Sequence, residues 1–129
     1  MIKEDRELLM RDLSCRIPYG VFVKIDGMSK IVKLTSISCY GEVGVDDGSN
    51  YLYPISEVKP YLFPLSSMTE EQEKEYNETL GVVINIDDST VFEEDKTYHT
   101  LDWLNKNHFD YRFLIDEGLA IDATDLNIY

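Results

Sequence analysis

The first apolar residues of the chain recur at the spacing of a helix. Leu9 and Leu13 stand four residues apart, and residues at this spacing share one face of a helix. Acidic Glu4 and Asp5 fall in what would be the first turn, where the helix dipole favours negative charge. We therefore predict a helix over residues 3–15, ended by the Pro-Tyr-Gly sequence that follows it.

The period then changes to that of strands. Residues 21–25, VFVKI, are β-branched and aromatic, and Asp26-Gly27 marks a turn. Residues 30–40 carry apolar side chains on both faces, so that strand is either covered on both sides or bent midway. Closely spaced strands with tight turns predict a strongly curved antiparallel sheet, and a small SH3-like barrel would hide its edges. The predicted strands of this region are residues 21–25, 30–40, 40–46 and 51–53, with the loop DDGSN before the last of them.

The next segment, residues 54–64, contains three prolines. Each proline lacks a backbone donor and favours extended geometry in the residue before it, so we expect this segment to cover the sheet without pairing as a strand. Pro60 and Pro64 have three residues between them, which does not fit a PxxP ligand. Thr69-x-x-Gln72 and Ser67-x-x-Glu70 both match a capping box and predict the start of a helix.

That helix is expected to run to about Leu80 and to end at Gly81. Beyond it we predict a strand at residues 82–86, an acidic loop, a helix at 98–107 after Thr97, and a short helix at 111–117 capped by Asp110. The chain is thus predicted to be one α+β domain over residues 1–129. It would have an N-terminal helix, a small curved antiparallel sheet and C-terminal helices.

Charge divides the chain into two unlike parts. The net charge is −13; residues 1–60 contribute −1 and residues 61–129, with four Lys/Arg and sixteen Asp/Glu, contribute −12. Such a chain is repelled by nucleic-acid backbones and anionic membranes, so we expect no direct nucleic-acid or membrane partner. A charged macromolecular partner should be basic. Alternatively, the acidic residues only solvate helices and loops.

The chain carries few signals of compartment or chemistry. It has no apolar run of about 18 residues, no secretion signal and two cysteines, so we expect a cytoplasmic protein. Cys15 and Cys39 are predicted to be buried thiols. Nucleophile-elbow, phosphate-loop and HExxH motifs are missing, and His99-x-x-Asp102 offers only two metal ligands. We therefore expect no enzymatic activity, no cofactor and no metal.

One segment concentrates polar and aromatic side chains, WLNKNHFDYRF at residues 103–113. It combines an imidazole, a carboxylate, a phenol and a guanidinium with a tryptophan, which are residue types that favour binding hot spots. The simpler interpretation is a packed corner in which aromatic residues fill the core, Asp110 caps and Arg112 pairs with an acid. The candidate partner- or ligand-binding residues are Trp103, His108, Asp110, Tyr111 and Arg112.

Three stretches of the chain together resemble a known group of proteins. They are KEDRELLMRDLSCRIPYGV, LYPISEVKPYLFPLSSMTEEQ and DWLNKNHFDYRFLIDEGLAIDA. The group consists of small uncharacterised proteins encoded in phages and mobile elements of gut anaerobic bacteria. The resemblance covers most of the chain and implies a genomic setting, but it assigns no residue a role. Phe113 stands where the resemblance leads us to expect a glycine.

These features lead to one expected function and one alternative. The expected function is that of a non-enzymatic, phage-type interaction protein. It would bind, and could inhibit, a host protein with a basic surface through the acidic C-terminal half. The alternative is a protein that binds a small nucleotide-type ligand at the corner formed by residues 108–112.

Overall fold

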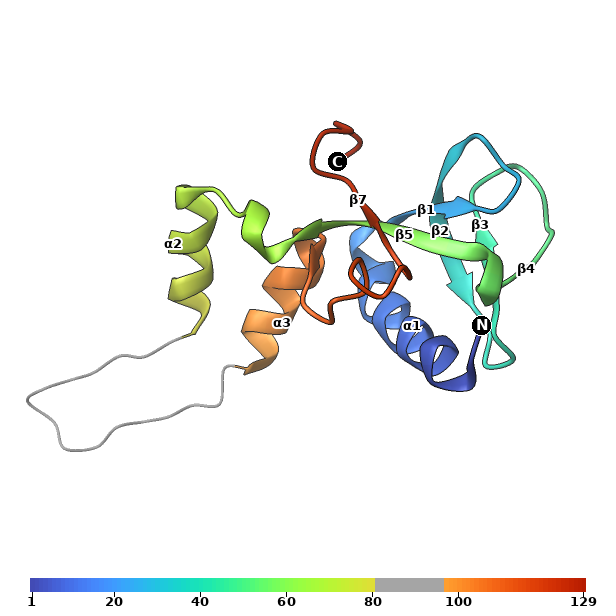
Figure 1. The fold of residues 1–129 in the computed structure, drawn as a ribbon, viewed down its shortest axis with the longest axis horizontal. Coiled ribbons are helices and arrows are strands. Elements are labelled where there is room, and N and C mark those ends of the chain that lie inside the picture. The colour runs from blue at the N-terminus through green and yellow to red at the C-terminus, as the bar shows by residue number, and fades with distance from the viewer. Residues whose placement is uncertain (81–96) are drawn as a thin grey trace, which may run out of the picture.

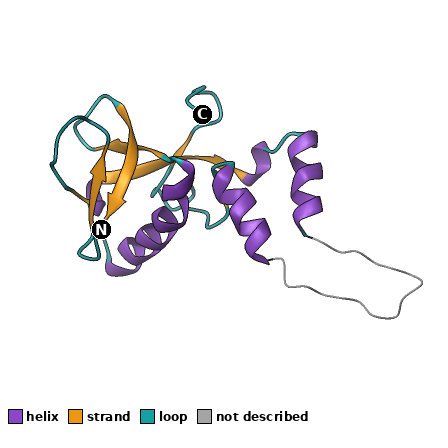
Figure 2. Cartoon of the chain, turned by 180° about the vertical axis from the view of Figure 1, so that it is seen from behind, coloured by secondary structure: helices purple, strands orange, loops and turns teal. Residues whose placement is uncertain are grey.

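The computed structural model describes residues 1–80 and 97–129 and shows an α+β fold (Figure 1). Figure 2 shows the same fold from behind, with helices and strands in different colours. Short 3-10 turns at Ile17–Tyr19, Ile55–Glu57 and Leu65–Ser67 connect the main elements. The helices are α1 (Lys3–Arg16), α2 (Glu70–Thr79) and α3 (Thr97–Lys106), and the strands are β1 (Phe22–Ile25), β2 (Ile31–Ile37), β3 (Glu42–Val45), β4 (Tyr53–Pro54), β5 (Val58–Pro64), β6 (Phe109–Asp110) and β7 (Ile121–Asp122).

The described strands form one mixed sheet that does not close on itself. Its order is β4-β3-β2-β1-β5-β6, and β7 also pairs with β5. The pairs from β4 to β5 are antiparallel, as predicted, but β6 and β7 run parallel to β5. The α+β class and the curved sheet are confirmed, whereas the SH3-like barrel is not.

The proline-rich segment is a strand, so the prediction that it only covers the sheet was wrong. β5 pairs with β1 through Val23 opposite Pro60 and Ile25 opposite Val58. Just beyond these pairs, the carbonyl of Glu57 accepts a hydrogen bond from the amide of Asp26. Because backbone groups alternate between the two edges of a strand, Pro60 faces away from β1. On that other edge, β7 joins only from Tyr61 onward. The missing donor of Pro60 therefore interrupts no bond to β1.

Helix α1 and the sheet enclose the core. Leu9 and Leu13 of α1 are fully buried, as their spacing predicts, and they belong to one apolar cluster with side chains of β1, β2, β3 and β5. Transfer of such side chains out of water is the main force that holds the helix on the sheet. The largest fully buried apolar members of the cluster are Leu9, Leu13, Ile25, Leu34, Ile55, Leu62 and Leu114.

Strand β2 bends midway, which was one of the two alternatives that its sequence left open. Val32 and Leu34 are buried while Ile31 is exposed, and the register with β3 shifts between Leu34 and Ser36. Gly44 lies at the shift, where a Cβ atom would meet Ser36 Oγ. A glycine in a strand commonly marks such a bulge, because it lets the backbones approach closely.

Both cysteines are exposed, so the prediction of buried thiols was wrong. Cys15 lies on the outer side of α1, between the buried residues Leu13 and Arg16. Cys39 follows the end of β2 in a turn. A free cysteine is often buried, but here the elements that carry the two residues turn them outward.

Other sequence predictions have mixed outcomes. The short helix predicted at residues 111–117 is a series of turns that follows β6. The strand predicted at 82–86, the helix end at Gly81 and the acidic loop before α3 lie outside the described residues. Within residues 1–80 and 97–129, no helix combines the length and apolar composition needed to cross a bilayer.

The start of α2 is confirmed at one of the two predicted caps. Thr69 Oγ1 accepts from the amide of Gln72 at 3.2 Å, and Gln72 Oε1 accepts from the amide of Thr69 at 2.9 Å. This reciprocal pair satisfies two amides that the helix itself cannot. Ser67 instead donates its hydroxyl to the carbonyl of Pro64.

We predict that Thr69→Ala lowers the local stability of α2 by about 1 kcal/mol, because it removes the side-chain acceptor of the cap. Hydrogen exchange of the α2 amides measures this loss. Ser66→Ala, an exposed change just before the helix, is the control and should leave exchange unchanged. Equal exchange in the two variants would contradict the role of the cap.

Candidate functional site

The structure places the five candidate residues at two locations. Trp103 lies on α3 in a groove that faces α2. The other four follow α3 and lie in or near β6, on the side of α3 that approaches α1. The candidate residues therefore do not form one site, and each location has its own chemistry.

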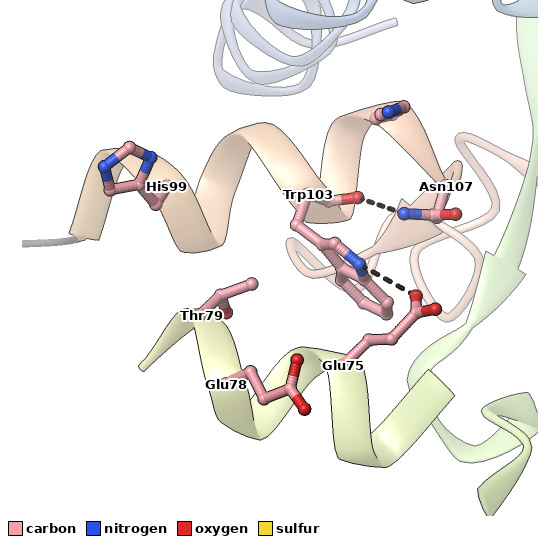
Figure 3. A pocket seen from close by; sticks show the side chains of 7 residues that line it. Glu75, Glu78, Thr79, His99, Trp103 and Asn107 are labelled. Atoms are coloured by element: carbon pink, nitrogen blue, oxygen red, sulfur yellow. Dashed lines mark hydrogen bonds between the residues drawn. The ribbon is translucent and has the colours of Figure 1, made fainter. Parts of the chain in front are cut away.

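The first location is an open groove between α2 and α3 (Figure 3). Its volume is about 690 Å³, within the range of small-ligand and peptide side-chain sites. The two helices lie side by side in both views of the fold. Three lining residues come from α2, three from α3 and one from the turn directly after α3: Glu75, Glu78, Thr79, His99, Trp103, Lys106 and Asn107.

Trp103 of α3 lines this groove and contacts α2. Its ring stacks nearly parallel to Phe109, with centroids 5.5 Å apart, and meets Tyr76 of α2 at 5.8 Å. The indole Nε1 donates to Glu75 Oε2 at 3.3 Å (Figure 3). Tryptophan often combines an apolar body with one polar contact in this way. The indole therefore holds the Glu75 carboxylate at the edge of the groove.

Negative charge accumulates on α2. The helix has one lysine, Lys74, and five glutamates, all of them exposed. Among the described residues, none of these carboxylates lies within ion-pair distance of a lysine or arginine. The glutamates are Glu70, Glu71, Glu73, Glu75 and Glu78.

The second location contains a buried ionic cluster. Asp12 and Arg16, one helical turn apart on α1, are both completely buried. Arg16 Nε donates to Asp12 Oδ2 at 2.7 Å, and Arg16 Nη2 donates to Asp12 Oδ1 at 3.1 Å. Arg112 Nη1 donates to the same Oδ1 at 2.8 Å. One carboxylate thus binds two guanidinium groups, which keeps all three charges hydrogen-bonded inside the protein.

The cluster connects α1 to the chain after α3. Arg16 Nη2 also donates to the carbonyl of Phe109 at 2.7 Å. Burial is the largest single influence on the pKa of Arg112 and lowers it, but the hydrogen bond to Asp12 and the electrostatic interactions with Tyr111 and Asp12 together outweigh burial and raise this pKa. Tyr111 lies beneath both guanidinium groups, at 5.1 Å from Arg16 and 4.7 Å from Arg112, and donates its hydroxyl to Asn105.

Asp110 organises the turn that follows β6. It is buried, and its carboxylate accepts from the amides of Leu114 and Ile115, both at 2.9 Å. The predicted cap is therefore present, although it organises a turn instead of a helix. Phe113 within this turn has φ 58°, a conformation that suits glycine better than phenylalanine.

His108 is held in an unusual backbone conformation, with φ 64°. Its ring stacks on Tyr129 with centroids 3.6 Å apart. Burial, and secondly the charge of Arg16, lower the pKa of His108 to about 4. Arg16 Nη1 and His108 Nδ1 are buried and make no hydrogen bond to any described residue. Protonation of His108 would therefore add positive charge beside Arg16 with no carboxylate to receive it.

Tyr129 ties the end of the described chain to the sheet. Its hydroxyl donates to the carbonyl of Tyr61 at 2.7 Å and accepts from the amide of Phe22 at 2.9 Å. Burial raises its pKa. Together with His108, it fills the space where β1 and β5 meet the chain after α3.

Sequence reasoning missed several of these residues. Asp12 and Arg16 stand four apart on a helix, the spacing of an ion pair, so that signal was available. The partners Arg112 and Phe109 lie about a hundred residues further along the chain, and no local pattern indicates their contact. Glu75 and Glu78 were counted only as part of a charged helix.

Both locations present side chains that can form hydrogen bonds. Within the part of the chain that the structure describes, no three His, Cys, Asp or Glu side chains come together in a way that could hold a metal ion. The carboxylates of the groove can accept hydrogen bonds from cationic groups. Comparisons with protein-family models, with curated proteins and with solved structures found no match to this chain. The resemblance to phage-encoded proteins therefore stays a prediction.

We predict that Asp12→Asn lowers the free energy of unfolding by about 3–5 kcal/mol, because it leaves two guanidinium groups without their carboxylate. Chemical denaturation measures the change. Glu7→Gln is the matched control: Glu7 pairs with Lys3 on the exposed side of the same helix, and its loss should cost less than about 1 kcal/mol. A comparable loss in both variants would contradict the importance of the buried cluster.

We also predict that His108 makes stability depend on pH. Its pKa is about 4 in the folded protein and 6.5 ordinarily. Between these values the unfolded chain binds a proton that the folded protein does not. The contribution of His108 is therefore complete above pH 6.5 and is lost as the pH falls toward 4.

Denaturation of His108→Asn from pH 7 to pH 4 isolates this contribution, because asparagine tolerates the same backbone conformation. The variant should lose less stability over this interval than the parent protein does. Parallel stability profiles for the two proteins would show that His108 does not titrate in this way.

Proposed function

We propose that this protein is a non-enzymatic interaction protein that binds a basic surface of another protein through α2 and the groove between α2 and α3. The observation that carries the proposal is the row of exposed glutamates on α2. No described lysine or arginine forms an ion pair with any of them. In the phage setting that the sequence suggests, the partner would be a host protein met in the cytoplasm, and binding could inhibit it.

Among the described residues of the later half of the chain, the fold leaves the acidic charge without compensating ion pairs. The bases of this half in the described residues are Lys74, Lys106 and Arg112. Arg112 turns inward to Asp12, which belongs to the first half of the chain. A basic partner would therefore supply the positive charge that the fold does not, and long-range attraction would speed its approach.

The groove adds shape to this charge. Glu75 and Glu78 line one wall and the Trp103 indole forms part of the other (Figure 3). A lysine or arginine side chain could lay its apolar stem along the indole edge and place its charged end against the carboxylates. Of the five candidate residues, Trp103 is the one that lines this groove.

The alternative of a nucleotide-type ligand gains less support. The groove would present the carboxylates of Glu75 and Glu78 and only one lysine, Lys106, to its phosphate groups, and the excess of like charge is unfavourable. At the other location, the guanidinium groups of Arg16 and Arg112 already bind Asp12. The proposed role of His108, Asp110, Tyr111 and Arg112 is to hold the chain after α3 in place, so that α3 faces α2.

The test compares two charge-matched double variants in affinity capture from a host lysate. Glu75→Gln/Glu78→Gln alters the groove, and Glu4→Gln/Glu7→Gln alters exposed glutamates of α1. The native protein should retain a basic protein at low salt and release it as salt increases. Relative to the native protein, the groove variant should lose about tenfold in affinity for the captured protein, equivalent to about 1.4 kcal/mol, and the α1 variant should lose little.

Two results would contradict the proposal. If no basic protein is retained at low salt, the acidic surface only solvates the helices. If both variants weaken binding equally, the partner responds to total charge and α2 has no special part in binding.

A further inference from the structure

A second groove lies at the end of the molecule away from α2. It is formed where the start of α1 meets the turn before β3 and the segment around β4, and its volume is about 550 Å³. Figure 1 shows β3 and β4 at one end of the long axis and α2 at the other. The lining residues used below are Arg6, Tyr40, Glu42, Tyr51 and Leu52.

Large apolar side chains around this groove are open to solvent. Tyr40 is 86% exposed, Tyr51 is 62% exposed and Leu52 is 45% exposed. Single exposed apolar residues are common, but a group of them beside a groove is typical of an interaction surface. Tyrosine is also among the residues that contribute most to protein interfaces.

The turn that displays Tyr40 is well ordered by hydrogen bonds. Ser38 Oγ accepts from the amides of Tyr40 and Glu42, each at 3.3 Å, and the carbonyl of Ser38 accepts from Gly41. Gly41 has φ 79°, and a Cβ atom at this position would contact Arg6, Met10 and Ile55. The side chain of Tyr40 is therefore directed into solvent by a defined turn, which reduces the entropy lost when such a side chain binds.

The groove also carries two opposite charges. Arg6 and Glu42 both line it, and among the described residues neither side chain forms an ion pair with another part of the chain. A surface that contains both charges is complementary to itself, because a two-fold axis brings residue i of one copy to residue j of the other and the reverse.

We propose that this groove binds a second copy of the chain, in a two-fold dimer with Tyr40, Tyr51 and Leu52 at the centre and Arg6 of each copy paired with Glu42 of the other. An apolar centre with charges at the rim is the usual anatomy of such an interface. The surface belongs to residues 1–60, whose net charge is −1. The copies therefore meet through their nearly neutral parts and keep the acidic α2 helices apart.

The dimer rests on observations separate from those behind the proposed function. If both hold, each dimer presents two acidic grooves at its far ends. A partner with two basic sites, or two partners on one assembly, would then be bound more tightly than by one copy alone.

The test measures molecular mass by sedimentation equilibrium of the full chain over a wide range of concentrations. We expect a reversible monomer–dimer equilibrium. Arg6→Glu and Glu42→Arg should each raise the dimer dissociation constant about tenfold or more, and the Arg6→Glu/Glu42→Arg double variant should restore it to near the native value. Tyr40→Ser should weaken the dimer as well.

Lys30→Glu is the control, since Lys30 is exposed and does not line the groove. It changes the charge as Arg6→Glu does, and it should leave the dissociation constant unchanged. A monomer at every concentration would overturn the proposal and leave the groove to another partner. A dimer that is insensitive to Tyr40→Ser, or that the charge exchange does not restore, would also overturn it.

Discussion

The carboxylate of Asp12 is the group on which the arrangement of this protein depends most. A buried carboxylate is costly unless every oxygen is paired, and Asp12 meets that condition with Arg16 from its own helix and Arg112 from 100 residues away. The same Arg16 binds the carbonyl of Phe109. These hydrogen bonds hold α1 and the sheet against the chain that follows α3. Because α3 ends just before β6, they also set where α3 lies relative to the sheet.

The buried cluster of Asp12, Arg16 and Arg112 also affects the charge balance at the other end of the molecule. Arg112 is one of four bases in residues 61–129, and the fold uses it to balance a carboxylate from the first half. The glutamates of α2 are left facing solvent, with the Trp103 groove beside them. The proposed binding of a basic partner and the proposed self-association thus use opposite ends of the folded molecule. One end is acidic and helical, and the other is nearly neutral and rich in exposed tyrosine.

Local patterns were sufficient for most helices and strands, because spacing and caps are local properties. The α1 stripe, the strands before residue 54 and the Thr69 cap follow from neighbouring residues. Pairing across long distances was not predictable in the same way. The prolines of β5 indicated a segment without strand pairing, yet Pro60 faces the edge where no bond to β1 is needed. Asp110 was correctly predicted as a cap, but its turn includes Phe113 at φ 58° and forms no helix. The spacing of Asp12 and Arg16 indicates an ion pair, but the burial of Arg16 and the groove at Glu75 could not be inferred from the sequence alone, since each depends on segments brought together by the fold.

The exposed carboxylates of α2, with the groove beside them, form the proposed binding surface. The most direct measurement is a titration with a short arginine-rich peptide, followed through the backbone amide signals in nuclear magnetic resonance spectra at low and high salt. The account predicts that shifts concentrate on α2 and on the Trp103 side of α3, including the indole N–H, and that salt reverses them. Shifts spread evenly over all acidic positions, or centred on α1 and the sheet, would contradict it.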